Sequence, residues 1–140
     1  MNRDTELERL VRFYQTLTLE TVQDLATMYA PDAHFKDPFN DVRGLVDIAR
    51  IFEHMFAQLD APRFEIRTCI VRGSEAFLIW DFCFAMKRGP QCIRGATHLS
   101  FGPDGLVVLH RDYWDAAEEL YEKLPVLGGF MRLLKRAVIG

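Results

Sequence analysis

The stretch that decides the fold is residues 102–115, GPDGLVVLHRDYWD, in which a turn precedes an apolar run and then polar and aromatic residues. The Gly-Pro-Asp-Gly turn signal and the apolar run predict a β-strand from Leu106 to Trp114. Because alternate strand residues share a face, His110 and Asp112 are expected to point the same way as Leu106. A carboxylate on a core-facing surface is costly unless it is paired or functional, so we expect a pocket here.

Helical spacing before this sheet, and a capping box at Thr5, predict an α+β protein. The predicted helices are Thr5–Leu17, Thr18–Tyr29 and Gly44–Leu59. Tyr29 lies on the apolar side of the second helix, and the apolar stripe of the third comprises Leu45, Ile48, Ile51, Phe52, Met55 and Leu59. The predicted strands are Arg63–Val71, Glu75–Lys87, Gln91–Phe101 and Leu106–Trp114. A last helix begins near Ala116, is interrupted around Pro125 and residues 128–129, and resumes from Phe130 to Val138. We expect a single domain over residues 1–140, in which three helices and a strongly curved antiparallel sheet form a cone around a pocket.

Composition narrows the classes of partner. The chain has 17 Lys and Arg against 20 Asp and Glu, which disfavours a nucleic-acid partner. The sequence has no signal-peptide pattern at its start and no apolar run of membrane-spanning length. Cys69, Cys83 and Cys92 lack metal or redox spacing, so free thiols and a cytoplasmic location are expected.

The turn at residues 102–105 also predicts a register, with Thr97 opposite His110 and Gly95 opposite Asp112. Thr97 would then line the pocket, and Gly95 would leave open space for a ligand over the carboxylate. The alternative is that Gly95 marks a bulge that bends the sheet.

A second carboxylate, Asp37, is expected in the same pocket. Pro38 biases Asp37 towards extended geometry, which places it on the same side as Phe35. Burial and a neighbouring carboxylate such as Asp112 would raise its pKa, as a general base near neutral pH requires. The alternative is that Asp37 caps its own loop through backbone N–H groups.

Tyr14 lies on the apolar side of the first helix and is the expected hydrogen-bond donor to a ligand, unless it is an ordinary core tyrosine. His110 and Asp112 share a face, but a metal ion would need a third ligand, so neither a metal nor a cofactor is expected. The expected apolar wall comprises Phe35, Trp80, Phe82 and Trp114.

The order of these elements, the tyrosine in the first helix, the segment Tyr29–Pro38 and the strand that ends in residues 110–115 resemble the nuclear transport factor 2-like, SnoaL-like proteins. These include ketosteroid isomerases, polyketide cyclases and limonene epoxide hydrolases, and the resemblance spans nearly the whole chain. It implies the cone-shaped fold and a hydrophobic small-molecule ligand. It leaves the reaction open, because this fold carries many functions, some of them non-catalytic.

The resemblance to ketosteroid isomerase implies that Tyr14 donates to a substrate oxygen and that Asp37 shuttles a proton, with Thr97 replacing a second donor. The resemblance to limonene epoxide hydrolase implies water activation by Asp112, although aromatic residues replace its two partners. Isomerisation or cyclisation of a carbonyl compound is therefore expected, with His110 assisting Asp112. Water addition and binding without turnover are the alternatives.

Two further expectations concern surfaces. Apolar residues such as Leu109 and Tyr113 lie opposite the pocket-facing set and need cover, which predicts a homodimer. The amphipathic, basic segment after Gly128 predicts a lid over the pocket, and its alternative is a helix on an anionic membrane surface.

Overall fold

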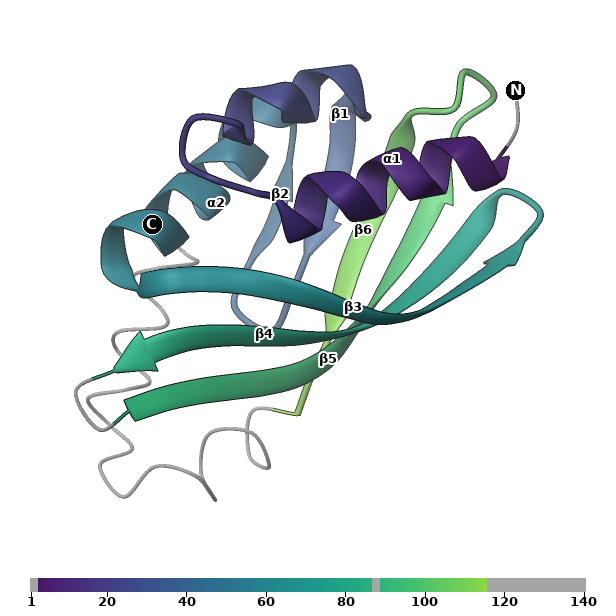
Figure 1. Ribbon diagram of the computed structural model, residues 1–140. Helices are drawn as coiled ribbons and strands as arrows, with labels where there is room; N and C mark the ends of the chain where they lie inside the picture. The colour runs from purple at the N-terminus through teal and green to yellow at the C-terminus, as the bar shows by residue number, and fades with distance from the viewer. Residues whose placement is uncertain (1–2, 87–88, 116–140) are drawn as a thin grey trace.

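A six-stranded sheet curves around two helices in the computed structural model, which describes residues 3–86 and 89–115. The elements in chain order are α1 (Arg3–Gln15), the 3₁₀ segment η1 (Val22–Thr27), β1 (Tyr29–Lys36), β2 (Asp41–Arg43), α2 (Leu45–Gln58), β3 (Asp60–Arg72), β4 (Glu75–Met86), β5 (Gly89–Phe101) and β6 (Val107–Tyr113). The strand order is β2-β1-β6-β5-β4-β3. Figure 1 shows α1 and α2 on the same side of the sheet, so the predicted α+β architecture is confirmed.

The four predicted strands form the antiparallel part of the sheet, β3 to β6. Gly73 and Gly105 lie in the connecting turns with φ of +60° and +82°, a region that other residues rarely adopt. Register shifts in the β3–β4 ladder, on either side of residues 63–66, are β-bulge-like irregularities that bend the strands. This bending gives the sheet its concave face.

Two more strands extend the sheet beyond the predicted four. β1 pairs antiparallel with β2 and parallel with β6, so the sheet is mixed. In the parallel ladder Phe35 pairs with His110. This pairing brings the end of β1, where Asp37 follows, beside the end of β6, where Asp112 lies.

The core lies between the concave face and the helices. Helix α2 buries the predicted stripe of Ile48, Ile51, Phe52 and Met55. Burying a side chain of this size stabilises the fold by roughly 1.5–3 kcal/mol, so this stripe holds α2 on the sheet. Among the described residues, no helix is long and apolar enough to cross a membrane.

The predicted register between β5 and β6 was wrong by two residues. Thr97 pairs with Asp112 rather than with His110. One residue of offset comes from the hairpin loop, because Phe101 pairs with Val107, and the other comes from a bulge beside that pair. A bulge inserts an extra residue into one strand, which the turn sequence alone does not reveal.

Cys83 and Cys92 form a disulfide between β4 and β5, so the prediction of free thiols was wrong for these two residues. They lie directly opposite each other in the ladder, a pairing that depends on register rather than on sequence spacing. Cys69 is free and exposed. The disulfide removes the argument for a reducing compartment, and the cytoplasmic location stays a prediction.

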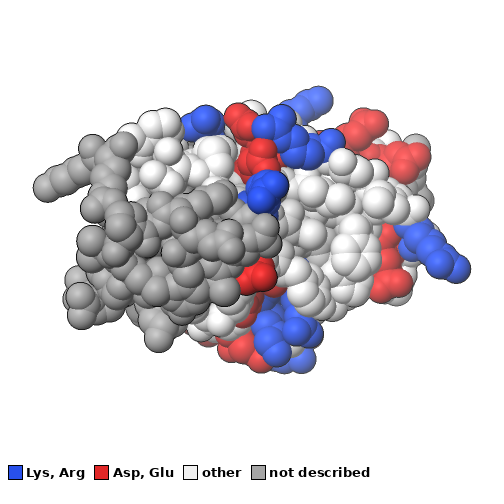
Figure 2. Space-filling view, turned by 90° about the horizontal axis from the view of Figure 1, so that it is seen from below, with Lys and Arg blue, Asp and Glu red and all other residues white. Residues whose placement is uncertain are grey.

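The face of the sheet away from the helices carries an apolar patch, which we call the outer patch. It consists of Ile70, Phe77, Ile79 and Tyr113, which are 43 to 55% exposed. Figure 2 shows a broad uncharged area, bordered by acidic and basic residues, on the face seen from below. The homodimer expected through this face stays a prediction. The predicted C-terminal helix, with its lid or membrane role, lies outside the described residues.

Candidate functional site

A chain of side-chain hydrogen bonds runs through the core to Asp112. Trp80 Nε1 donates to Thr97 Oγ1 at 2.7 Å, and Thr97 Oγ1 donates to Asp112 Oδ1 at 2.5 Å. His110 Nε2 lies 2.8 Å from the same oxygen, and its Nδ1 lies 2.6 Å from the hydroxyl of Tyr29. The chain therefore links β1, β4, β5 and β6 at one place in the sheet.

The chemistry of each group fixes the direction of these bonds. Because the indole N–H can only donate, the Thr97 oxygen accepts from Trp80 and its own O–H is left for Asp112. An ionised carboxylate only accepts, so His110 donates from Nε2, and in its neutral form its Nδ1 accepts from Tyr29. Asp112 Oδ1 thus receives two donors, whereas Oδ2 has no hydrogen-bond partner among the described residues.

Tyr14 forms the far end of the chain. Its hydroxyl is hydrogen-bonded to that of Tyr29 and lies 3.3 Å from His110 Nδ1. Burial raises the pKa of both phenols, so both keep their protons. With Tyr29 donating to His110, Tyr14 donates to Tyr29. The hydroxyl expected to reach a ligand is engaged inside the protein here, and its contact with a substrate stays a prediction.

Sequence reasoning missed Tyr29 as a member of the site. It was assigned to the apolar side of the second predicted helix, whereas it begins β1 and is completely buried. The sequence offered one indication of its role, because Tyr29 begins the extended segment that leads to Asp37. Only the parallel pairing of β1 with β6, however, brings its hydroxyl to His110.

Asp37 both caps its loop and faces the site. Its Oδ1 accepts the backbone N–H groups of Phe39 at 2.8 Å and Asn40 at 2.7 Å, and Asn40 Nδ2 lies 3.2 Å from each carboxylate oxygen. The same side chain lines a cavity together with Asp112. Burial, and then the charge of Asp112, raise the pKa of Asp37 to about 6 despite these hydrogen bonds. The sequence offered loop capping and a place in the pocket as alternatives for Asp37, and in the structure the same side chain does both.

The cavity between the two carboxylates has a volume of about 60 Å³, and we call it the aromatic chamber. A cavity of about 20 Å³, about the size of one water molecule, lies next to it and reaches Tyr14 and His110. Ring-to-ring contacts connect the chamber walls, such as Phe64 with Phe82 at 4.8 Å between centroids. The aromatic residues of the walls include Phe35, Phe39, Phe64, Trp80, Phe82 and Trp114.

Gly95 does not leave open space for a ligand over Asp112, as the predicted register required. It pairs with Trp80 of β4, and a Cβ atom at Gly95 would lie 2.4 Å from Cη2 of that indole. The missing side chain makes room for the indole ring, whose N–H bonds Thr97. Gly95 therefore acts on the site through Trp80.

No group of three or more His, Cys, Asp and Glu side chains is placed to hold a metal ion in residues 3–86 and 89–115. His110 and Asp112 are hydrogen-bonded to each other instead of converging on a common point. On the surface, His34 pairs with Asp41 at 2.5 Å. The absence of a metal and of a cofactor stays a prediction.

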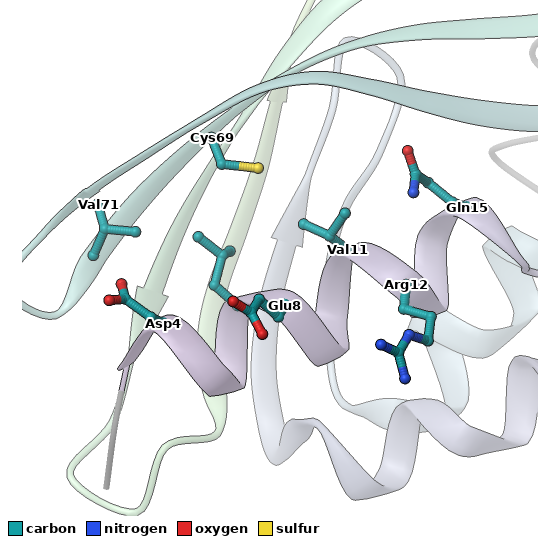
Figure 3. Close-up of a pocket in the computed structure, with 8 residues that line it drawn as sticks. Asp4, Glu8, Val11, Arg12, Gln15, Cys69 and Val71 are labelled. Carbon is teal, nitrogen blue, oxygen red and sulfur yellow. The ribbon is translucent and has the colours of Figure 1, made fainter.

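A larger hollow of about 550 Å³ lies between α1 and β3. Figure 3 shows Asp4, Glu8 and Arg12 along the helix, with Cys69 and Val71 on the strand across from them. Its charged groups lie spread along the helix, and burial raises the pKa of the Cys69 thiol, which makes it a poorer nucleophile at neutral pH. The aromatic chamber, which is lined by both Asp37 and Asp112, is therefore the candidate site.

The fold described above is that of the SnoaL-like proteins. The model of the SnoaL-like domain family matches residues 10–110, so the chain belongs to this family. The matched segment contains Tyr14, Asp37 and His110. No curated protein sequence matches the chain significantly.

Several solved structures share the fold. A hypothetical protein with a ketosteroid isomerase-like fold from Catenulispora acidiphila, in complex with trimethylamine, has 15% identity and a TM-score of 0.70, over 83% of this chain and 89% of that one. A nuclear transport factor 2-like protein of unknown function from Burkholderia pseudomallei has 15% identity and a TM-score of 0.72, over 86% and 97%. A proposed isomerase of the SnoaL-like family from Agrobacterium tumefaciens has 16% identity and a TM-score of 0.67, over 81% and 97%. At these identities the likeness concerns the fold.

Proposed function

We propose that this protein binds a small, mostly apolar molecule in the aromatic chamber and moves a proton on it without a cofactor. The observation that carries the proposal is that Asp37 and Asp112 open on one cavity with aromatic walls. A carboxyl group whose pKa is about 6 changes its protonation state close to neutral pH, as a general acid–base group requires. The description of the Agrobacterium structure as a proposed isomerase agrees with this class of reaction.

The two carboxylates have different parts in this proposal. Asp37 takes up and releases the proton: its ionised form removes a proton from the carbon beside a carbonyl group and returns it at another position of the same molecule. Asp112 accepts hydrogen bonds from Thr97 and His110 on Oδ1, and no described residue donates to its Oδ2. Proton transfer by a positioned group contributes roughly 10²- to 10⁴-fold to the rate.

Binding without turnover is the second candidate. The observation that favours it is that Phe39 and Asn40 donate to the Asp37 carboxylate. In addition, the hydroxyls of Tyr14 and Thr97 donate within the protein, so neither is free for a substrate oxygen. Water addition to an epoxide has less support. The resemblance to limonene epoxide hydrolase implies a water-activating group of two Asp and one Arg, and no Arg lines the chamber among the described residues.

Hydrogen–deuterium exchange at the carbons beside the carbonyl group of cyclopentanone, followed by NMR in D₂O, separates the two candidates. We expect the protein to accelerate exchange over buffer, and Asp37→Asn to slow the accelerated rate roughly 10²-fold. The matched control is Asp32→Asn, which removes an exposed carboxylate of β1 and should leave the rate unchanged. Binding of the ketone without faster exchange would favour the binding protein, and absence of binding would contradict both candidates.

A further inference from the structure

In the part of the protein that the structure describes, the aromatic chamber is lined by two acidic side chains and by no basic one. Among the described residues that line it, Asp37 and Asp112 are the charged ones, and none is Lys or Arg. We propose that the molecule bound in the chamber carries an organic ammonium group, which lies between the two carboxylates and the aromatic rings. This inference rests on the proposed function, because it specifies the chemistry of the ligand of the same chamber.

The first argument is electrostatic. A buried charge is costly unless it is paired, and two carboxylates that share a cavity repel each other. Backbone and side-chain amide groups donate to Asp37, and Thr97 and His110 donate to Asp112 Oδ1, so no described Lys or Arg neutralises either carboxylate. A ligand ammonium group would supply that charge and a donor for Asp112 Oδ2, whereas an anionic ligand would add to the repulsion.

The second argument comes from the walls. Phe64 lies against Trp80 and Phe82, with ring centroids 5.7 Å and 4.8 Å away, and Phe39 lies 5.5 Å from Trp114. Ring faces attract organic cations, whose alkyl groups also gain from apolar contact. A metal ion would instead need more oxygen or nitrogen ligands than the described residues of the chamber supply. The walls therefore favour an alkylated ammonium group over a metal ion.

The third argument is size. The chamber volume of about 60 Å³ corresponds to about four to six non-hydrogen atoms, on the basis that one water needs about 10–15 Å³ by the same measure. A trimethylammonium group falls in this range. We therefore infer that the ammonium head group fills the chamber and that any longer part of the ligand extends out of it.

Choline and 3,3-dimethylbutan-1-ol test the inference, because they have the same shape and differ in carrying nitrogen or carbon at the branch point. We expect isothermal titration calorimetry of the full chain to show at least ten-fold tighter binding of choline. Equal or tighter binding of the alcohol would overturn the ammonium inference and leave the proposed function standing. If neither compound binds but cyclopentanone does, only the ammonium inference fails, and if none of the three binds, the proposed function fails as well.

Two variants locate the binding site. The double variant Asp37→Asn/Asp112→Asn keeps the size of both side chains and removes both charges, so it should remove most of the preference for choline over the alcohol. Asp32→Asn, whose carboxylate is exposed on β1, should keep that preference. An undiminished preference in a folded double variant, as judged by circular dichroism, would place the cation site outside the chamber and overturn the inference.

Discussion

Replacing Asp37 with Asn should reduce the loss of folding stability that accompanies rising pH. The pKa of Asp37 is raised from 3.8 to about 6 by burial and by Asp112, so the folded protein holds this proton more tightly than the unfolded chain does. Between about pH 4 and pH 6 the folded state therefore binds more protons, and the free energy of unfolding falls as the pH rises. At 1.36 kcal/mol per pKa unit, the full effect above pH 6 is about 3 kcal/mol.

The assay is urea unfolding of the wild type and of Asp37→Asn at several pH values between 4 and 8. As the pH rises across this range, the free energy of unfolding of the variant relative to the wild type should rise by about 3 kcal/mol. The altered loop hydrogen bonds of the variant add an offset that is the same at every pH and does not affect this slope. Other titrating groups largely cancel in the difference. The same comparison for Asp32→Asn, an exposed carboxylate, should show a much smaller change. If the difference in unfolding free energy between wild type and Asp37→Asn does not vary with pH, the argument that burial and Asp112 raise the pKa of this carboxyl group to about 6 is refuted.

Three other substitutions test separate features. Thr97→Val removes the charge-assisted hydrogen bond to Asp112 and should lower the free energy of unfolding by about 1.5–3 kcal/mol in urea titrations. Gly95→Ala should destabilise the protein by about 1–3 kcal/mol and shift its tryptophan fluorescence, because the new Cβ forces the Trp80 indole to move; unchanged fluorescence would contradict the assigned packing. Ile79→Asp on the outer patch should convert the proposed homodimer to monomer by light scattering, and a wild type that is already monomeric would disprove that dimer.

Periodicity was a reliable guide wherever a strand or helix was regular. The helical spacing of Ile48, Ile51 and Phe52 identified the buried side of α2, because this pattern depends on residues a few positions apart. Strand alternation similarly placed His110 and Asp112 on one face, and the two side chains are hydrogen-bonded. Such patterns therefore report which nearby residues share one face of a helix or strand.

Pairing between distant segments was not predictable in the same way. The bulge next to Phe101 displaced the expected partner of Thr97, because one extra residue shifts every later pair. The disulfide between Cys83 and Cys92 depends on the β4–β5 register, and the place of Tyr29 in the site depends on the β1–β6 ladder. Each is a long-range or register property that a single sequence does not specify.

The parallel pairing of β1 with β6 also determines when the site can form during protein synthesis. The hydrogen bond between the Tyr29 hydroxyl and His110 cannot form until His110 has been synthesised, 81 residues after Tyr29. Until then one side of β1 has no strand partner, and unpaired strand edges promote aggregation. Contacts of such long sequence separation also slow folding after release. A nascent chain arrested before β6 should therefore lack the chamber and depend on chaperones, whereas an arrested chain whose β6 has left the ribosome should be able to bind ligand.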